Sequence, residues 1–174
     1  MYLPHPLMVA LLAGAMQLLQ SYWNSFVTWA GFASWACYFI FVGKPSLGSM
    51  LKVIACWSSG VLASIVVILL GSNLLMGQFE LSATLAFPVS LGLVATVVIS
   101  CENLPTLDWI PVWFIGSACL FGYHADHPNE LSTLSYEGLL IVSSAIIGQL
   151  FGWLTVVSRN RYATFQHKLL STPE

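Results

Sequence analysis

The sequence predicts an all-α membrane protein that crosses the bilayer several times. The first 43 residues contain no Asp, Glu, Lys or Arg, and residues 53–79, 81–101, 109–125 and 138–158 also lack these four types. About 20 consecutive apolar residues form a helix that can cross the hydrocarbon core of a bilayer. Charged side chains are costly in that environment, and backbone groups must bond within the helix. These five charge-free runs therefore indicate a polytopic helical protein.

Composition supports the same class and bounds the partners. Hydrophobic residues make up 57% of the chain and charged residues 7%, with a mean hydropathy of +0.82, whereas a soluble domain carries about 25% charged residues. The formal net charge of −2 provides no basic surface for nucleic acid. We therefore expect one transmembrane domain over residues 1–161, with the lipid bilayer as its principal partner, and a short cytoplasmic tail over residues 162–174.

Six transmembrane helices are expected. The first charge-free run is too long for one helix, and the polar, turn-prone segment from Ser21 to Ser25 divides it. A single kinked helix over this run is the alternative. The six expected spans are Leu3–Leu19, Ser25–Val42, Met50–Gly71, Leu81–Ser100, Trp109–Tyr123 and Gly138–Val157.

The basic residues predict the orientation of these spans. Lys44 and Lys52 flank the connection between the second and third spans, and the other three basic residues follow the sixth span. Six spans place all five on the same side of the membrane, which the positive-inside rule makes the cytoplasm. Five or seven spans would divide them between the two sides. The opposite side then carries Glu80, Asp126 and Glu130 without Lys or Arg.

An internal repeat is indicated when the chain is displaced by 82 positions against itself. Eight identities then appear between residues 1–43 and 83–125, and the longest group pairs Phe32, Ala36, Cys37 and Phe39 with Phe114, Ala118, Cys119 and Phe121. We expect two three-helix halves, at about residues 1–75 and 81–158. Because three is an odd number, the halves enter the membrane from opposite sides, as in many transport proteins with inverted repeats.

Aromatic and amide side chains within the spans are the candidates for lining a solute path. Aromatic stripes often belong to a core or face lipid, and an intramembrane amide often bonds a neighbouring helix. The alternative is an aromatic constriction that passes small uncharged molecules, with amides as donors and acceptors along the path. The candidates are Gln17, Trp29, Phe32, Trp35, Phe114 and Gln149.

Charged and ionisable residues at the expected span ends are candidates for a mouth or a gate. Glu102 and Asp108 lie in a cytoplasmic connector, where Asp108 could instead cap the following helix. His124, Asp126 and His127 end the fifth span on the external side. These three residue types are typical of a weak metal site or a pH sensor, although a solvated loop explains them as well. We expect neither a bound metal nor a cofactor.

The sequence lacks the residues that several functional classes need. The sequence has no phosphate-binding loop, no HExxH motif and no recognisable nucleophile motif, which argues against an enzyme. The expected spans contain no carboxylate or lysine of the kind used by proton-coupled pumps. We therefore expect a passive channel or facilitator for a small uncharged or weakly acidic solute, forming a homo-oligomer. The alternative is a structural or accessory subunit of a larger membrane complex.

Three segments carry a resemblance to a known family. They are Phe26–Gly48, Ile110–Cys119 and Ile147–Gly152. In these segments the chain resembles the YcdZ-like small inner-membrane proteins of bacteria, a family without an assigned mechanism. The resemblance implies a location in the bacterial inner (cytoplasmic) membrane and implies no catalytic or binding residues.

Overall fold

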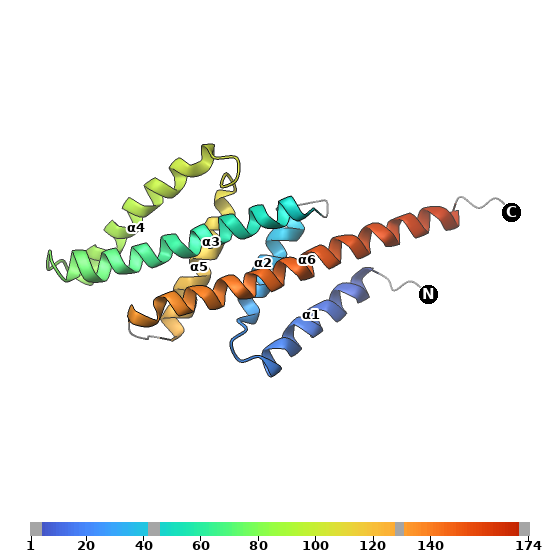
Figure 1. The fold of residues 1–174 in the computed structure, drawn as a ribbon, viewed down its shortest axis with the longest axis horizontal. Helices are drawn as coiled ribbons and strands as arrows, with labels where there is room; N and C mark the ends of the chain where they lie inside the picture. Colours follow the sequence, from blue (N-terminus) through green and yellow to red (C-terminus); the bar gives the residue numbers. More distant parts are fainter. Residues whose placement is uncertain (1–4, 42–45, 128–130, 171–174) are drawn as a thin grey trace. The chain divides into compact units, whose positions relative to one another are not determined.

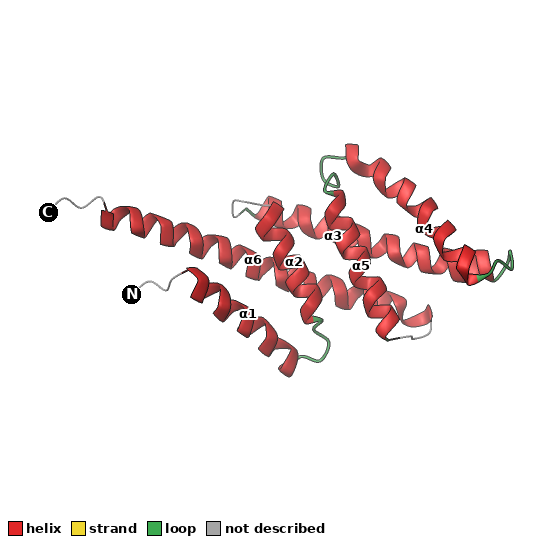
Figure 2. Cartoon of the chain, turned by 180° about the vertical axis from the view of Figure 1, so that it is seen from behind, coloured by secondary structure: helices red, strands yellow, loops and turns green. Residues whose placement is uncertain are grey.

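The computed structural model describes residues 5–41, 46–127 and 131–170, and this part of the chain contains helices and loops but no strand (Figures 1 and 2). The all-α class and the expectation of six helices are confirmed. The six α-helices are α1 (His5–Tyr22), α2 (Thr28–Phe41), α3 (Leu47–Leu69), α4 (Ala83–Ser100), α5 (Ile110–Asp126) and α6 (Leu134–Leu170). A π-helical segment, η1 (Leu70–Met76), continues α3, and two short 3-10 helices, η2 (Cys101–Asn103) and η3 (Leu131–Thr133), precede α5 and α6.

Helix boundaries follow the sequence except at two places. The break between α1 and α2 confirms the predicted turn, so the alternative of one kinked helix is wrong. Helix α6 was expected to end near Val157 but continues to Leu170, because nothing between these residues breaks a helix. The expected span ends Leu3 and Val42, together with Lys44, Glu130 and residues 171–174, lie outside the described residues.

Among the described residues, three helical stretches are long and apolar enough to cross a membrane. They are Leu47–Met76, Ala83–Asn103 and Leu131–Thr164, which indicates a multi-pass membrane protein. By contrast, α2 has 14 residues and α5 has 17. At 1.5 Å per residue, α1, α2, α4 and α5 each fall short of the roughly 30 Å of hydrocarbon in a bilayer. The two shortest described α-helices are the second and the fifth along the chain, and α2 is described only as far as Phe41.

The chain forms two compact units that do not coincide with its two sequence halves. Unit 1 comprises Met1–Leu51 and Ser144–Glu174, and unit 2 comprises Lys52–Ser143. Unit 1 therefore holds α1, α2 and most of α6, while unit 2 holds most of α3 together with α4 and α5. Each unit thus combines the first two helices of one sequence half with most of the third helix of the other half.

Unit 1 is organised by a close approach of α2 and α6, which cross in Figure 1. A Cβ atom added to Gly148 would overlap with the backbone carbonyl of Gly31, and one added to Gly152 would overlap with the side chain of Tyr38. Small residues allow helix backbones to approach in this way. The Ser34 hydroxyl donates to the Ala145 carbonyl at 2.8 Å across the same contact. Residues with small or short side chains therefore set the spacing of these helices.

The same kind of contact joins α3 and α5 in unit 2. A Cβ atom on Gly60 would overlap with the carbonyl of Trp113, and one on Gly116 would overlap with the carbonyl of Trp57. The Ser117 hydroxyl donates to the Gly60 carbonyl at 2.7 Å. As in unit 1, a serine on the shorter helix bonds a carbonyl of the longer helix beside a glycine contact.

The α2–α6 contact can be tested with two glycine substitutions. We expect Gly148→Ala to lower the unfolding temperature in detergent, because an added methyl group must displace backbone, and overpacking costs about 1–3 kcal/mol. Gly14→Ala is the matched control, since nothing lies within 4 Å of a Cβ atom at Gly14. It should be neutral or slightly stabilising, because alanine favours a helix over glycine by about 1 kcal/mol. Equal unfolding temperatures for the two variants would contradict the described packing.

Candidate functional site

Unit 1 contains an apolar pocket among α1, α2 and α6. Its volume is about 390 Å³. The rings of Phe32 and Trp35 stack at a centroid distance of 5.8 Å, and the Phe151 ring is tilted against Trp35 at 5.9 Å. The Trp35 indole Nε1 donates to Thr155 Oγ1 at 3.0 Å, so the polar atoms of these two residues bond one another. The pocket is lined by Val9, Ala13, Phe32, Trp35, Ala36, Phe39 and Thr155.

Unit 2 contains a second apolar pocket, among α3, α4 and α5, with a volume of about 240 Å³. Two serine hydroxyls on its wall are both engaged, since Ser64 Oγ donates to the Ser117 carbonyl at 3.2 Å and Ser117 Oγ donates to the Gly60 carbonyl. Its lining comprises Ala63, Ser64, Val67, Leu91, Val94, Ala95, Val98, Trp113, Phe114, Ser117, Ala118 and Phe121.

The two pockets are lined by corresponding positions of the sequence. Six of the seven residues around the first pocket have a counterpart 82 positions later that lines the second pocket. This is the displacement at which the sequence matches itself. The four identical pairs join Ala13, Phe32, Ala36 and Phe39 to Ala95, Phe114, Ala118 and Phe121. The pockets differ chemically at one pair, because Trp35 in the first corresponds to Ser117 in the second.

Among the aromatic candidates, three line these pockets and one does not. Phe32 and Trp35 lie at the first pocket and Phe114 at the second. Trp35 is buried, whereas 51% of Phe114 is exposed. Trp29 is 45% exposed and lines neither pocket.

The two amide candidates occupy different environments. Gln17 is exposed and its side chain lies 3.5 Å from that of Gln20. Gln149 is fully buried, and its Nε2 donates to the carbonyl of Ser34 at 2.6 Å and to the Ser34 hydroxyl at 2.8 Å. Its Oε1 has no hydrogen-bond partner among the described residues. Gln149 therefore links α6 to α2 directly beside the glycine contact.

The connector before α5 is joined to α3 by an ion pair. Lys52 Nζ lies 2.5 Å from Asp108 Oδ1 and 4.8 Å from the centroid of the Trp109 ring. The capping residue of α5 is Trp109, without a side-chain capping bond, so the expectation that Asp108 caps this helix is wrong. The carboxylate instead neutralises a lysine. Glu102 is exposed in η2.

The end of α5 carries a partly exposed histidine paired with a buried glutamate that the sequence did not predict. Glu137, in the first turn of α6, is 1% exposed. Its Oε2 lies 2.8 Å from His124 Nδ1, and its Oε1 accepts from Thr133 Oγ1 at 3.0 Å. Glu137 lies one residue before the expected sixth span, so the expectation that the spans contain no carboxylate did not include it, although the observed helix α6 does. A negative charge is also favoured at a helix N-terminus by the helix dipole.

The other two candidates at this end, Asp126 and His127, do not contact Glu137 in any interaction described for them. Asp126 and His127 are exposed, and the His127 ring stacks on Tyr123 at a centroid distance of 4.5 Å. No group of three or more His, Cys, Asp or Glu side chains in the described part of the chain could hold a metal ion. Of the three residues predicted at this end, only His124 has a buried acidic partner.

The helices and pockets define a multi-pass helical membrane protein in which each compact unit contains an apolar pocket. Residues 6–158 match the family described as "Protein of unknown function (DUF1097)", and the chain belongs to this family. No curated protein and no solved structure matches the chain.

The pair of His124 and Glu137 gives a prediction for stability. Glu137→Leu removes the carboxylate that contacts His124 Nδ1 and Thr133 Oγ1, and leaving a hydrogen-bonding group without its partner costs about 1–3 kcal/mol. We expect a clear fall in the unfolding temperature in detergent, whereas Asp126→Leu on the exposed side should change it little. The double variant Glu137→Leu/His124→Leu should recover part of the loss, because no ionisable group is then left unpaired. A single variant as stable as the unmodified protein would refute the pairing.

Proposed function

We propose that the chain forms six membrane spans in two inverted three-helix repeats and acts as a passive channel or facilitator for a small uncharged or weakly acidic solute. The observation that carries this proposal is the pair of aromatic pockets at corresponding positions of the two sequence halves. In inverted-repeat transporters, solute sites are formed by corresponding segments of the two repeats near the bilayer midplane.

The lengths of the helices also support a solute path along α2 and α5. The two short helices α2 and α5 correspond to one another at the displacement of 82. Unusually short apolar segments in corresponding positions of two halves are the best sequence-level indication of a transporter binding site. Phe32, Trp35 and Phe114 all lie on these two helices, so the pocket-lining aromatic residues and the short helices coincide.

Hydrogen bonding between helices provides a further correspondence. Ser34 of α2 bonds the carbonyl of Ala145 in α6, and Ser117 of α5 bonds the carbonyl of Gly60 in α3. Gly60 and Ala145 are 85 positions apart, the same displacement that pairs Ser58 with Ser143. The two donors are one position out of register at the displacement of 82, because Ser34 corresponds to Gly116, but both bonds join corresponding helices, which supports a duplicated three-helix arrangement.

The expected setting is the inner membrane of a bacterium, as for the YcdZ-like proteins, with the basic residues in the cytoplasm and several copies of the chain assembled together. Lys52, Arg159 and Arg161 belong to the basic set that six spans place on one side. Pocket walls of aliphatic and aromatic groups, with bonded serine and threonine hydroxyls, suit a small neutral solute better than a hydrated ion, because such walls replace little of an ion's hydration.

Flux through proteoliposomes tests the proposal. Purified protein is reconstituted, and stopped-flow light scattering records the entry of urea, formamide, glycerol, acetate and ammonia. We expect faster entry of at least one solute than into protein-free liposomes. Phe114→Ala should raise that flux by roughly two- to tenfold, since loss of one aromatic contact lowers a barrier by about 0.5–1.4 kcal/mol.

The control for this variant is Phe79→Ala, which removes a ring that is 64% exposed and lines neither pocket. It should leave the flux unchanged. If folded Phe114→Ala and Phe32→Ala both show the flux of the unmodified protein, the aromatic pockets are not part of the path. Absence of flux for the whole panel, together with a stoichiometric foreign protein in a mild-detergent pulldown, would favour an accessory subunit instead.

A second candidate function is proton-linked transport, which is favoured by the buried Glu137 and its contact with His124. Buried ionisable residues in helical membrane proteins commonly belong to ion or proton pathways. Solute accumulation against its gradient, driven by an imposed pH difference and abolished in Glu137→Gln, would distinguish coupled from passive transport. Flux that follows only the solute gradient would exclude the coupled form.

A further inference from the structure

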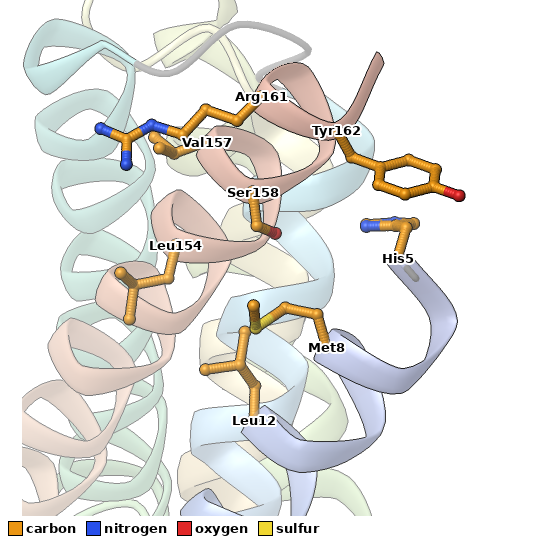
Figure 3. Close-up of a pocket in the computed structure, with 8 residues that line it drawn as sticks. All are labelled: His5, Met8, Leu12, Leu154, Val157, Ser158, Arg161 and Tyr162. Carbon is orange, nitrogen blue, oxygen red and sulfur yellow. The ribbon is translucent and has the colours of Figure 1, made fainter. Parts of the chain in front are cut away.

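A third pocket lies between the first turns of α1 and the later turns of α6, within unit 1 (Figure 3). Its volume is about 290 Å³, and it shares no residue with the aromatic pocket of the same unit. Polar groups from both helices gather at one end, where His5 lies beside Tyr162 and the Ser158 hydroxyl faces α1. Arg161 lies on the opposite flank of α6 from Tyr162.

The remainder of the pocket is apolar. Met8 and Leu12 of α1 and Leu154 of α6 line the part that extends away from the chain termini, and Val157 lies beside Arg161. The pocket is therefore amphipathic along its length, polar at one end and aliphatic along the rest. This division matches a molecule that carries a polar head on a hydrocarbon chain.

One polar atom of this pocket lacks a partner. The Nδ1 atom of His5 is buried and has no hydrogen bond to any described residue. A buried nitrogen without a partner is unfavourable, and a ligand with a complementary oxygen would relieve this cost. An imidazole can donate or accept at this atom, because its tautomer adjusts to the partner.

The charge near the polar end favours an anionic ligand. Arg161 is exposed and takes part in none of the ion pairs among the described residues. Residues 138–173 contain no Asp or Glu but include Arg159, Arg161 and Lys168. A guanidinium binds phosphate oxygens with two parallel hydrogen bonds. An exposed side chain also changes rotamer within nanoseconds, so Arg161 can turn toward a phosphate at the pocket mouth.

We propose that this pocket binds an anionic phospholipid, with the phosphate at His5, Ser158 and Arg161 and the beginning of an acyl chain along Met8, Leu12 and Leu154. Basic pockets between transmembrane helices on the cytoplasmic side accept anionic lipid head groups. Free phosphate would satisfy the polar end alone and leave the aliphatic length unused. The lipid therefore accounts for the whole lining.

The proposal is independent of transport and is tested by binding. The full chain in a non-ionic detergent is titrated with short-chain phosphatidylglycerol, phosphatidylcholine or inorganic phosphate, and the unfolding temperature and the lipid adducts in native mass spectrometry are recorded. We expect phosphatidylglycerol to raise the unfolding temperature and to form a one-to-one adduct. Phosphatidylcholine and inorganic phosphate should have little effect at the same concentrations.

Two arginine variants distinguish a site from general attraction between charges. Arg161→Gln should weaken phosphatidylglycerol binding about tenfold, or about 1.4 kcal/mol, because it removes a charged hydrogen bond to the phosphate. Arg159→Gln is the matched control, since Arg159 is exposed two residues away and does not line the pocket. His5→Phe removes the unpaired nitrogen but keeps an aromatic ring, and it should also weaken binding.

Three outcomes would overturn the proposal. Equal losses in Arg159→Gln and Arg161→Gln would show attraction by net charge alone. An equal effect of phosphatidylcholine would show that the head-group charge is not recognised. Stabilisation by inorganic phosphate to the same extent would show an anion site that makes no use of the aliphatic lining.

Discussion

The close approach of a short helix to a long one is the constraint on which the rest of the structure depends. In each unit a glycine brings one helix backbone against a carbonyl of its partner, at Gly148 and Gly31 in unit 1 and at Gly60 and Trp113 in unit 2. Lipid tails are as apolar as leucine, so packing and interhelical hydrogen bonds must hold such helices together. The serine bonds and the Gln149 amide lie at these contacts. The larger aromatic side chains are thereby displaced to the flanks, where they line the pockets.

Charge-free runs were sufficient to predict the number of helices and most of their bounds. The underlying reason is that a bilayer excludes charged side chains and requires internally bonded backbone, so both constraints act on local sequence. The end of α6 was missed because a polar helix past the membrane border breaks no such rule. The partner of each helix was not predictable either. Nothing local in the sequence indicates that α6 packs with α1 and α2 from Ser144 onward, or that its first turns contact α5.

The candidate site also has parts that the sequence predicted and parts that it could not predict. The repeat identified Phe32 and Phe114 as corresponding residues, and they line corresponding pockets. The sequence could not show that Trp29 and Gln17 face outward, because exposure depends on which helix covers each face. The burial of Glu137 was not predicted, because this residue lies one position before an expected span. The signals that could have identified it are the Thr133–Glu137 spacing of four residues and a histidine at the end of the preceding helix, both of which place hydrogen-bonding groups beside the carboxylate.

The division of the chain into units also sets an order of assembly during synthesis. Unit 2 is one uninterrupted segment, Lys52–Ser143, whereas unit 1 joins two segments that flank it. Because synthesis begins at the N-terminus, α1 and α2 are made first. At that stage they lack α6, the helix that supplies Ala145 and Gln149. The side chain of Ser34 therefore lacks its final partners until the last helix has been synthesised. The first part of the protein to be made is thus the last to be completed, and any chain released before α6 leaves that surface open to the quality-control machinery of the membrane.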